Sequence, residues 1–148
     1  MSNIRVINQY IKDLSFEIPN APNVFLNNQE KPNIALSVDI DAKKITKDSF
    51  EITLKVKADA TSANNKLFIC EISYCGIFAL QNIENEMIEQ VLLVYCPNLL
   101  FPYLRRIVSN VVSDGGFPPL MLEPIDFSSL YEKRQETLQS MPVNDTKN

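Results

Sequence analysis

Residues 96–131 read CPNLLFPYLRRIVSNVVSDGGFPPLMLEPIDFSSLY, and this stretch decides the fold. Its first half has the apolar spacing of a helix, interrupted by Pro97 and Pro102 and ended by Gly115 and Gly116. Proline removes an amide donor and clashes with the preceding turn, so we expect these prolines to bend or interrupt the helix. The paired glycines predict a left-handed C-terminal cap.

The segment after the glycines is apolar where a polar connection would be expected. It carries Phe117, Leu120, Met121, Leu122 and Ile125. Either the rest of the protein covers this loop, or the loop contacts something apolar outside the chain. Each of these side chains therefore has two interpretations, as a cap on the core or as part of a binding surface.

A helix-type pattern also precedes this stretch, over Ile83–Tyr95, and begins with acidic residues as a helix N-terminus prefers. Its later part is apolar on every side, and a helix of that kind is buried all round. One sheet covers only one side, so we expect a second subunit on the other. The predicted oligomer interface consists of Val91, Leu92, Val94 and Tyr95.

The end of the chain predicts a short C-terminal helix capped by Asp126. Its apolar stripe would be Phe127, Leu130, Tyr131, Leu138 and Met141. We expect residues 1–141 to form a single domain and the polar residues 142–148 to be a disordered tail.

Four segments in the first half of the chain alternate apolar and polar residues, as half-buried strands do. They are residues 13–18, 34–41, 50–58 and 67–74, with Asn- and Pro-rich links between them. Short links without helical crossovers predict an antiparallel sheet with one buried and one solvated face. The predicted fold class is α+β, a four-stranded antiparallel sheet followed by a long kinked helix and a short C-terminal helix.

The fourth segment breaks its own alternation, because Leu67 and Ile69 lie on the face that is otherwise polar. A strand edge or a bulge would explain this. So would a small apolar patch beside Glu71 that contacts a protein partner.

Composition narrows the possible functions. The chain has 148 residues, 45% of them hydrophobic and 22% charged, as in a soluble globular domain. A net charge of -4 without a basic stripe argues against nucleic acid. No secretory signal or spanning apolar run is visible, so we expect a cytoplasmic protein that does not insert into membranes. Cys70, Cys75 and Cys96 have no metal-type spacing and fit a reducing compartment.

Catalytic chemistry has little support in the sequence. The chain has no histidine, and its three glycines form no phosphate-binding loop. The carboxylate pairs Glu84 with Glu86 and Asp39 with Asp41 would suit acid–base work, but solvated surface charge is the more common role of such pairs. We expect no enzyme activity and no cofactor.

The residues resemble the SecB family of bacterial export chaperones. The blocks CPNLLFPY and GGFPPLMLEPIDF carry the resemblance, and it extends through KDLSFEIPNAPNVF, LFICEISYCGIFAL and IENEMIEQVLLVYCPN. It implies a chaperone that works without ATP, holds precursor proteins unfolded and delivers them to the motor SecA. It also implies a homotetramer, a dimer of dimers with the long helices between two outer sheets.

The resemblance further implies long apolar grooves for extended, unfolded clients. The residues matching the groove walls are Phe25, Leu26, Ile34, Leu36, Phe68, Phe117, Leu120, Leu122 and Ile125. The positions matching the SecA-docking residues are Asp13, Glu17, Ile69 and Glu71, all on the solvated face by strand parity. The net negative charge of that face is reduced by Lys12, Lys55 and Lys57. The tail lacks a long acidic extension.

Two alternatives stay open at this point. A SecB-like chaperone could control a toxin within a toxin–antitoxin system, using the same fold and grooves. A small-ligand or enzymatic domain would instead need a defined pocket with converging polar groups.

Overall fold

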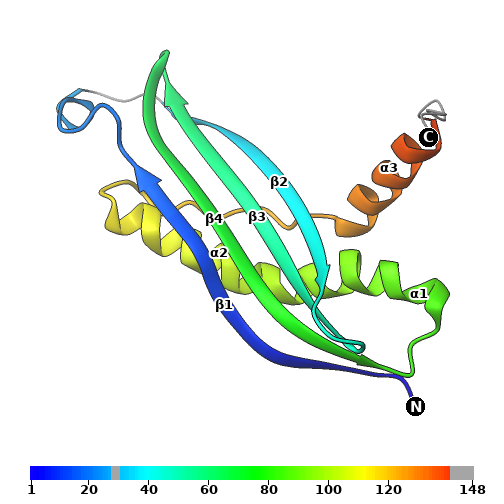
Figure 1. Cartoon of the computed structure of the whole chain (residues 1–148). Helices are drawn as coiled ribbons and strands as arrows, with labels where there is room; N and C mark the ends of the chain where they lie inside the picture. The colour runs from blue at the N-terminus through cyan, green and yellow to red at the C-terminus, as the bar shows by residue number, and fades with distance from the viewer. Residues whose placement is uncertain (28–30, 141–148) are drawn as a thin grey trace, which may run out of the picture.

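The chain folds into one four-stranded sheet with a long helix across one face (Figure 1). The computed structural model describes residues 1–27 and 31–140. The strands are β1 (Asn3–Glu17), β2 (Asn33–Lys44), β3 (Ser49–Ser62) and β4 (Asn65–Gln81). The helices are the 3-10 turn η1 (Asn23–Phe25), α1 (Asn85–Gln90), the π-helical turn η2 (Val91–Tyr95), α2 (Cys96–Asp114) and α3 (Phe127–Ser140). The predicted α+β class and element order are confirmed.

The sheet has the order β1-β4-β3-β2, and every neighbouring pair is antiparallel. The β3–β4 hairpin turns through Ala63 and Asn64, which both have positive φ angles, 47° and 67°. A two-residue hairpin with two left-handed residues matches the twist of the strands it joins. β1 and β2 are the two edges of the sheet.

Bulges in β1 explain why this strand is longer than the alternation predicted. β1 contains register shifts between Val6 and Asn8 and between Ile11 and Asp13, and β3–β4 shifts between Ala60 and Thr61. Each bulge inserts one residue and reverses the face on which the following side chains lie. The simple two-residue period is therefore lost over the first half of β1.

The helical segment runs from Asn85 to Asp114 without a break. Of the two outcomes predicted for Pro97 and Pro102, a bend or an interruption, the interruption is therefore wrong. The irregularity lies in η2, directly before Pro97, where the Cys96 amide bonds to the Val91 carbonyl one residue farther back than in an α-helix. A widened turn gives room to a proline ring that would clash with the preceding carbonyl.

The predicted glycine cap at the end of α2 is confirmed. Gly116 has a φ of +95°, and its amide bonds to the Ser113 carbonyl at 3.1 Å. The Phe117 amide reaches the Val112 carbonyl at 3.3 Å. These two bonds make a Schellman motif, which ends the helix and turns Phe117 back toward it.

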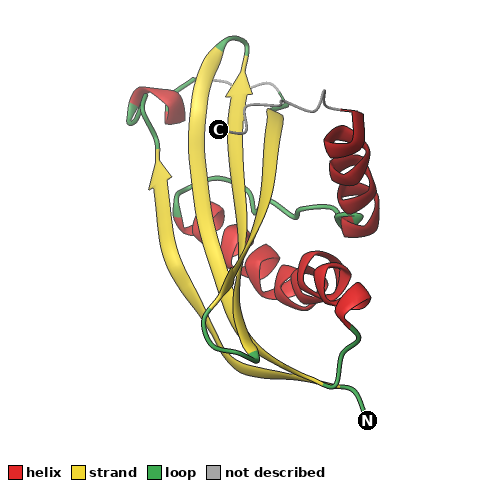
Figure 2. Ribbon diagram, turned by 45° about the vertical axis from the view of Figure 1, so that its right-hand side comes forward, coloured by secondary structure: helices red, strands yellow, loops and turns green. Residues whose placement is uncertain are grey.

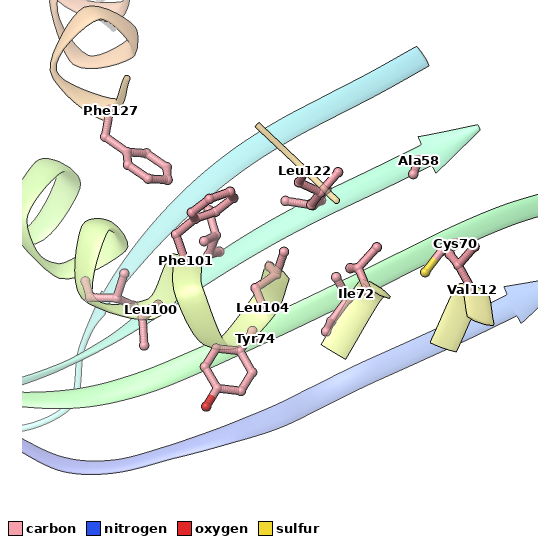
Figure 3. Packing of buried hydrophobic residues seen from close by; sticks show 14 of the residues in the cluster. Ala58, Cys70, Ile72, Tyr74, Leu100, Phe101, Leu104, Val112, Leu122 and Phe127 are labelled. Atoms are coloured by element: carbon pink, nitrogen blue, oxygen red, sulfur yellow. The ribbon is translucent and has the colours of Figure 1, made fainter. Parts of the chain in front are cut away.

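The core lies between the sheet and the helix, as Figure 3 shows. Leu104 from α2 packs with Ile72 of β4, while Phe101 meets Phe127 edge-on with ring centroids 6.1 Å apart. By length and composition alone the helix Asn85–Asp114 could cross a membrane. Its fully buried residues, such as Leu100 and Leu104, pack in the protein's own core instead.

Asp126 caps α3 as predicted. Its Oδ1 accepts the Ser129 amide at 3.1 Å and its Oδ2 accepts the Ser129 hydroxyl at 2.7 Å, which lowers the pKa of the carboxyl. The predicted apolar stripe is only partly covered, because Phe127 is buried while Leu130 and Leu138 are exposed. Met141 and the predicted tail, residues 142–148, lie outside the described residues.

Candidate functional site

Four phenylalanine rings from distant parts of the sequence form a continuous chain at the end of α2. Phe16 stacks on Phe68 at 5.4 Å between ring centroids, Phe68 meets Phe117 at 5.1 Å, and Phe117 meets Phe25 at 5.1 Å. The rings come from β1, β4, the loop after α2 and η1 respectively. Aromatic contacts at these spacings add to the gain from burial and fix the elements relative to one another.

The two glycines make room for this chain of rings. A Cβ atom on Gly115 would lie 2.3 Å from Cε1 of Phe16, and one on Gly116 would lie 3.1 Å from Cε1 of Phe25. The glycines therefore serve both the helix cap and the close approach of the rings. The first role can be predicted from the glycines themselves, whereas the second depends on rings that come from distant parts of the sequence.

An apolar cavity of about 330 Å³ opens beside these rings. Its lining comes from β2, β4 and the loop after α2, namely Lys31, Pro32, Ile34, Leu67, Phe68, Phe117, Pro118, Pro119 and Leu120. Ile34, Phe68, Phe117 and Leu120 had all been predicted as groove residues. The structure brings these four predicted residues together around one space.

The other predicted groove residues differ in their exposure. Leu26 is 80% exposed, and Phe25 and Leu36 are each 46% exposed. Leu122 is buried in the core, while Ile125 is half-buried. Within the apolar loop, Leu122 therefore belongs to the core, while Ile125 is left partly open to solvent. Figure 2 shows this loop running from the end of the long helix to α3.

The irregular fourth strand also has two explanations. Leu67 sits in the β3–β4 bulge and turns into the core, where it is 2% exposed. Ile69 keeps the parity of the outer face and is half-buried there, opposite Glu17 of β1. The bulge accounts for Leu67 and leaves Ile69 as an apolar residue on a polar face.

The predicted docking residues share the outer face, the one turned away from the helix. Asp13 pairs with Ser73, Ser15 with Glu71 and Glu17 with Ile69. Directly opposed residues of neighbouring strands lie on the same face, so Glu17 lies beside Ile69, Glu71 follows two positions along β4, and Asp13 lies opposite Ser73, four positions from Ile69. Glu71 lies 3.6 Å from Lys57 in an exposed ion pair, whereas Asp13 and Glu17 form no ion pair with any described residue.

A polar cluster without any signature in the sequence lies on the same face. Glu51 of β3 accepts a hydrogen bond from the Tyr10 hydroxyl, and both of its oxygens accept hydrogen bonds from the Lys12 ammonium group, at 3.0 and 3.2 Å. These bonds lower the pKa of Glu51, while burial and the neighbouring carboxylate raise that of Tyr10. Tyr10 and Lys12 precede Glu51 by 41 and 39 positions in the sequence, so no local pattern predicts the cluster.

The three cysteines are free and buried. Burial raises the pKa of each thiol, that of Cys96 to about 12. The Cys75 thiol contacts the Thr53 hydroxyl at 3.3 Å, beneath the cluster around Glu51. Among the residues the structure describes, no group of acidic or cysteine side chains is arranged to hold a metal ion.

The predicted oligomer residues face different surroundings. Leu92 belongs to the chain's own core, Val91 and Val94 are half-buried, and Tyr95 is 47% exposed. The helix that looked apolar on every side is thus covered partly by its own sheet. Tyr95 points to a surface that the chain itself leaves open.

Comparison with known proteins identifies the family. Residues 1–138 match the family described as "Preprotein translocase subunit SecB". The chain belongs to the SecB family. The chain is 44% identical over 133 residues to the protein-export protein SecB of Parvibaculum lavamentivorans, an alignment that covers 90% of this chain and 79% of the relative. SecB of Bradyrhizobium sp. is 45% identical over 133 residues, with 90% and 82% covered.

A solved structure supports the fold. A SecB-like chaperone of Mycobacterium tuberculosis, solved in complex with a ChAD peptide from an antitoxin, superposes with a TM-score of 0.69. It covers 82% of this chain and 90% of its own, at 13% identity. At that identity the match bears on the fold alone.

Membership of the SecB family makes the chain a protein-export chaperone and not an enzyme. The enzymatic alternative is thereby excluded. The SecB relatives are named as protein-export proteins, so the comparisons favour export over control of a toxin.

Proposed function

We propose that the cavity beside the four phenylalanine rings is part of a groove that binds unfolded precursor proteins as extended segments. The observation that carries the proposal is the meeting of Ile34, Phe68, Phe117 and Leu120 around one apolar space. The exposed Phe25, Leu26 and Leu36, with the half-buried Ile125, extend the apolar surface beyond the cavity, and Leu122 supports it from the core.

An apolar groove without a fixed set of hydrogen bonds suits many different clients. Each aliphatic or aromatic client side chain that becomes buried contributes roughly 1.5–3 kcal/mol before ordering costs. Several such contacts along one chain give tight binding through multivalency, while each contact stays weak enough to exchange. No nucleotide is needed for capture of this kind.

Two neighbouring residues of the loop provide a matched test. Leu120 lines the cavity, whereas Met121 is 63% exposed and does not line it. We expect Leu120→Ser to weaken binding of a fluorescent, permanently unfolded client by about fivefold, the loss of roughly half a buried leucine. Met121→Ser should leave the affinity within about twofold. Equal affinities for the two variants would contradict the assignment of the groove.

We further propose that the outer face docks SecA through Asp13, Glu17, Ile69 and Glu71. Three carboxylates along one face, with one apolar residue beside Glu17, suit a basic partner with a small apolar contact. Lys57 partly neutralises Glu71, and Lys12 is occupied by Glu51, so Asp13 and Glu17 remain the freest charges. Lys55 lies opposite Ser73 on the same face and further dilutes its acidity.

Charge reversal tests this docking face. Glu71→Lys should weaken SecA binding by about tenfold, as loss of a complementary charge does, and spare client binding. Asp41→Lys, on the same face but on β2, is the control and should change SecA binding by less than about threefold. Loss of client binding in Glu71→Lys, or unchanged SecA binding, would remove Glu71 from the docking set.

The working assembly is proposed to be a cytoplasmic homotetramer of single-domain subunits, each comprising residues 1–141. Val91, Val94 and Tyr95 offer apolar surface on the long helix, and edge strand β1 exposes Ile11. Light scattering should give four times the subunit mass of 16.8 kDa, and Tyr95→Asp should reduce it. A wild-type monomer at micromolar concentration would refute the assembly.

A further inference from the structure

The orientation of the proposed docking residues depends on a bulge in β1. Tyr10 pairs with Cys75 and Ile11 with Tyr74, but Asp13 pairs with Ser73, so Lys12 is one extra residue. Because of this insertion, Tyr10 and Asp13 both point to the outer face although they are three residues apart. Leu14 and Phe16 then face the helix.

A regular ladder would place the same residues on the opposite face. Continued from Ile11 without the extra residue, it would oppose Asp13 to Ile72 and Glu17 to Phe68, both core residues on the helix side. A shift of one residue reverses every following side chain. The bulge is thus what directs Asp13 and Glu17 outward and Phe16 inward.

One carboxylate holds the inserted residue and the residue two positions before it. Lys12 is the inserted residue and Tyr10 precedes it by two positions, and both reach across β4 to Glu51 of β3. The Glu51 side chain is only 13% exposed, so its carboxylate is largely shielded from water, whereas the Lys12 side chain that bonds to it remains 54% exposed. Cys75, the β4 residue opposite Tyr10, is fully buried beneath them.

We propose that Glu51 is a positioning residue that fixes the β1 bulge through its hydrogen bonds with Tyr10 and Lys12. The fixed bulge in turn directs Asp13 and Glu17 to the outer face for SecA docking. The inference rests on the proposed function of the outer face. Glu51 acts through β1, so it need not contact SecA itself. Its partners differ from the docking residues, which makes the two roles separable.

Three variants divide the cluster without removing docking residues. Tyr10→Phe deletes one hydrogen bond and no charge. The double variant Lys12→Met with Glu51→Gln removes the ion pair at constant net charge. The exchanged pair Lys12→Glu with Glu51→Lys restores an ion pair of opposite direction. Asp39→Asn removes one exposed charge from the same face, on β2 opposite Lys55, and leaves the cluster intact, so it controls for charge alone.

Two measurements are made on the full-length protein, namely SecA affinity and amide hydrogen exchange in residues 10–17. We expect Tyr10→Phe and the double neutral variant to accelerate exchange there and to weaken SecA binding by about threefold to tenfold. The exchanged pair should recover most of both, and Asp39→Asn should change neither. Binding of an unfolded client should stay within about twofold in the exchanged pair.

The possible outcomes distinguish the positioning role of Glu51 from the proposed docking of SecA on the outer face. Wild-type protein that does not bind SecA would refute the docking face, and the positioning role with it. SecA binding that is sensitive to Glu71→Lys but unaffected by Tyr10→Phe and the double neutral variant would overturn the positioning role alone. The variants could instead weaken SecA binding without changing amide hydrogen exchange, while Lys12→Glu with Glu51→Lys restores no binding. Glu51 would then be a direct SecA contact, which also overturns the positioning role.

Discussion

Replacing Gly115 with alanine tests whether the helix end and the phenylalanine rings form one packed unit. Gly115 has φ −77° and ψ 0°, a conformation that alanine also adopts, so the substitution does not strain the backbone. Alanine would even restrict the unfolded chain and stabilise the fold by about 0.4–1 kcal/mol. Any destabilisation must therefore come from what the new methyl group meets.

That methyl group would meet the ring of Phe16. The Cβ atom would lie 2.3 Å from Cε1 and 2.6 Å from Cζ of that ring. Ordinary carbon contacts are about 3.5–4.0 Å, so the ring must retreat by more than about 1 Å. Its stacking on Phe68 opposes such a movement. Overpacking of this kind costs about 1–3 kcal/mol, so we expect Gly115→Ala to be destabilising overall by about 1–2 kcal/mol.

A double-mutant cycle isolates the contact. In a Phe16→Ala background the clash is gone, and Gly115→Ala should become neutral or stabilising by up to about 1 kcal/mol. Urea unfolding followed by far-UV circular dichroism, at one fixed protomer concentration, gives the four free energies. The same change in stability on both backgrounds would refute the reasoning, because it would show that Gly115 and the Phe16 ring do not interact.

Three further predictions concern other groups. Gly116→Ala should lower the free energy of unfolding by about 1–2 kcal/mol in urea titrations, because an alanine is strained at a φ of +95°. A loss of stability no larger than that caused by an alanine substitution at an exposed site would contradict this. The hydrogen bonds from Tyr10 and Lys12 and the field of Lys43 make the pKa of Glu51 lower in the folded chain than in the unfolded chain. The contribution of Glu51 to the free energy of unfolding is therefore complete above the ordinary Glu pKa of about 4.3 and is lost as pH falls through the lower folded value. Glu51→Gln should flatten that part of the plot of stability against pH, and an unchanged plot would count against the shift. Burial raises the pKa of Cys96 to about 12, and all three thiols are covered, so a thiol reagent at pH 8 should label the native protein far more slowly than the urea-unfolded one.

The sequence predicted most of the fold because its main elements follow simple periods. The glycine cap at Gly116 and the N-cap at Asp126 were both predicted from local chemistry, since a cap depends on residues within one helical turn. The start of β1 was missed for the opposite reason. Its bulges at Ile7 and Lys12 each reverse the alternation, so no window of the sequence shows a regular strand.

The candidate site could be predicted in part for a related reason. Phe117 and Leu120 stand out because apolar side chains in a loop need an explanation. The contacts of Phe16 with Phe68 and of Tyr10 with Glu51 join residues about 40 to 50 positions apart, and their partners depend on strand order and register. The continuity of the helix through Pro97 was also beyond reach, because a π-helical turn leaves no residue pattern of its own.

In the proposed function, two strands carry both binding surfaces, one on each face of the sheet. On β4, Phe68 lines the client groove while Ile69 and Glu71 belong to the docking face; on β1, Phe16 supports the groove while Glu17 points outward. Alternate side chains of a strand lie on opposite faces, so adjacent residues serve different partners. A client in the groove therefore leaves the docking face open, and SecA can engage a loaded chaperone without competing for its surface. Under this proposal the two sites share β1 and β4, and the register of β1 decides which of its side chains serve the groove and which serve the docking face.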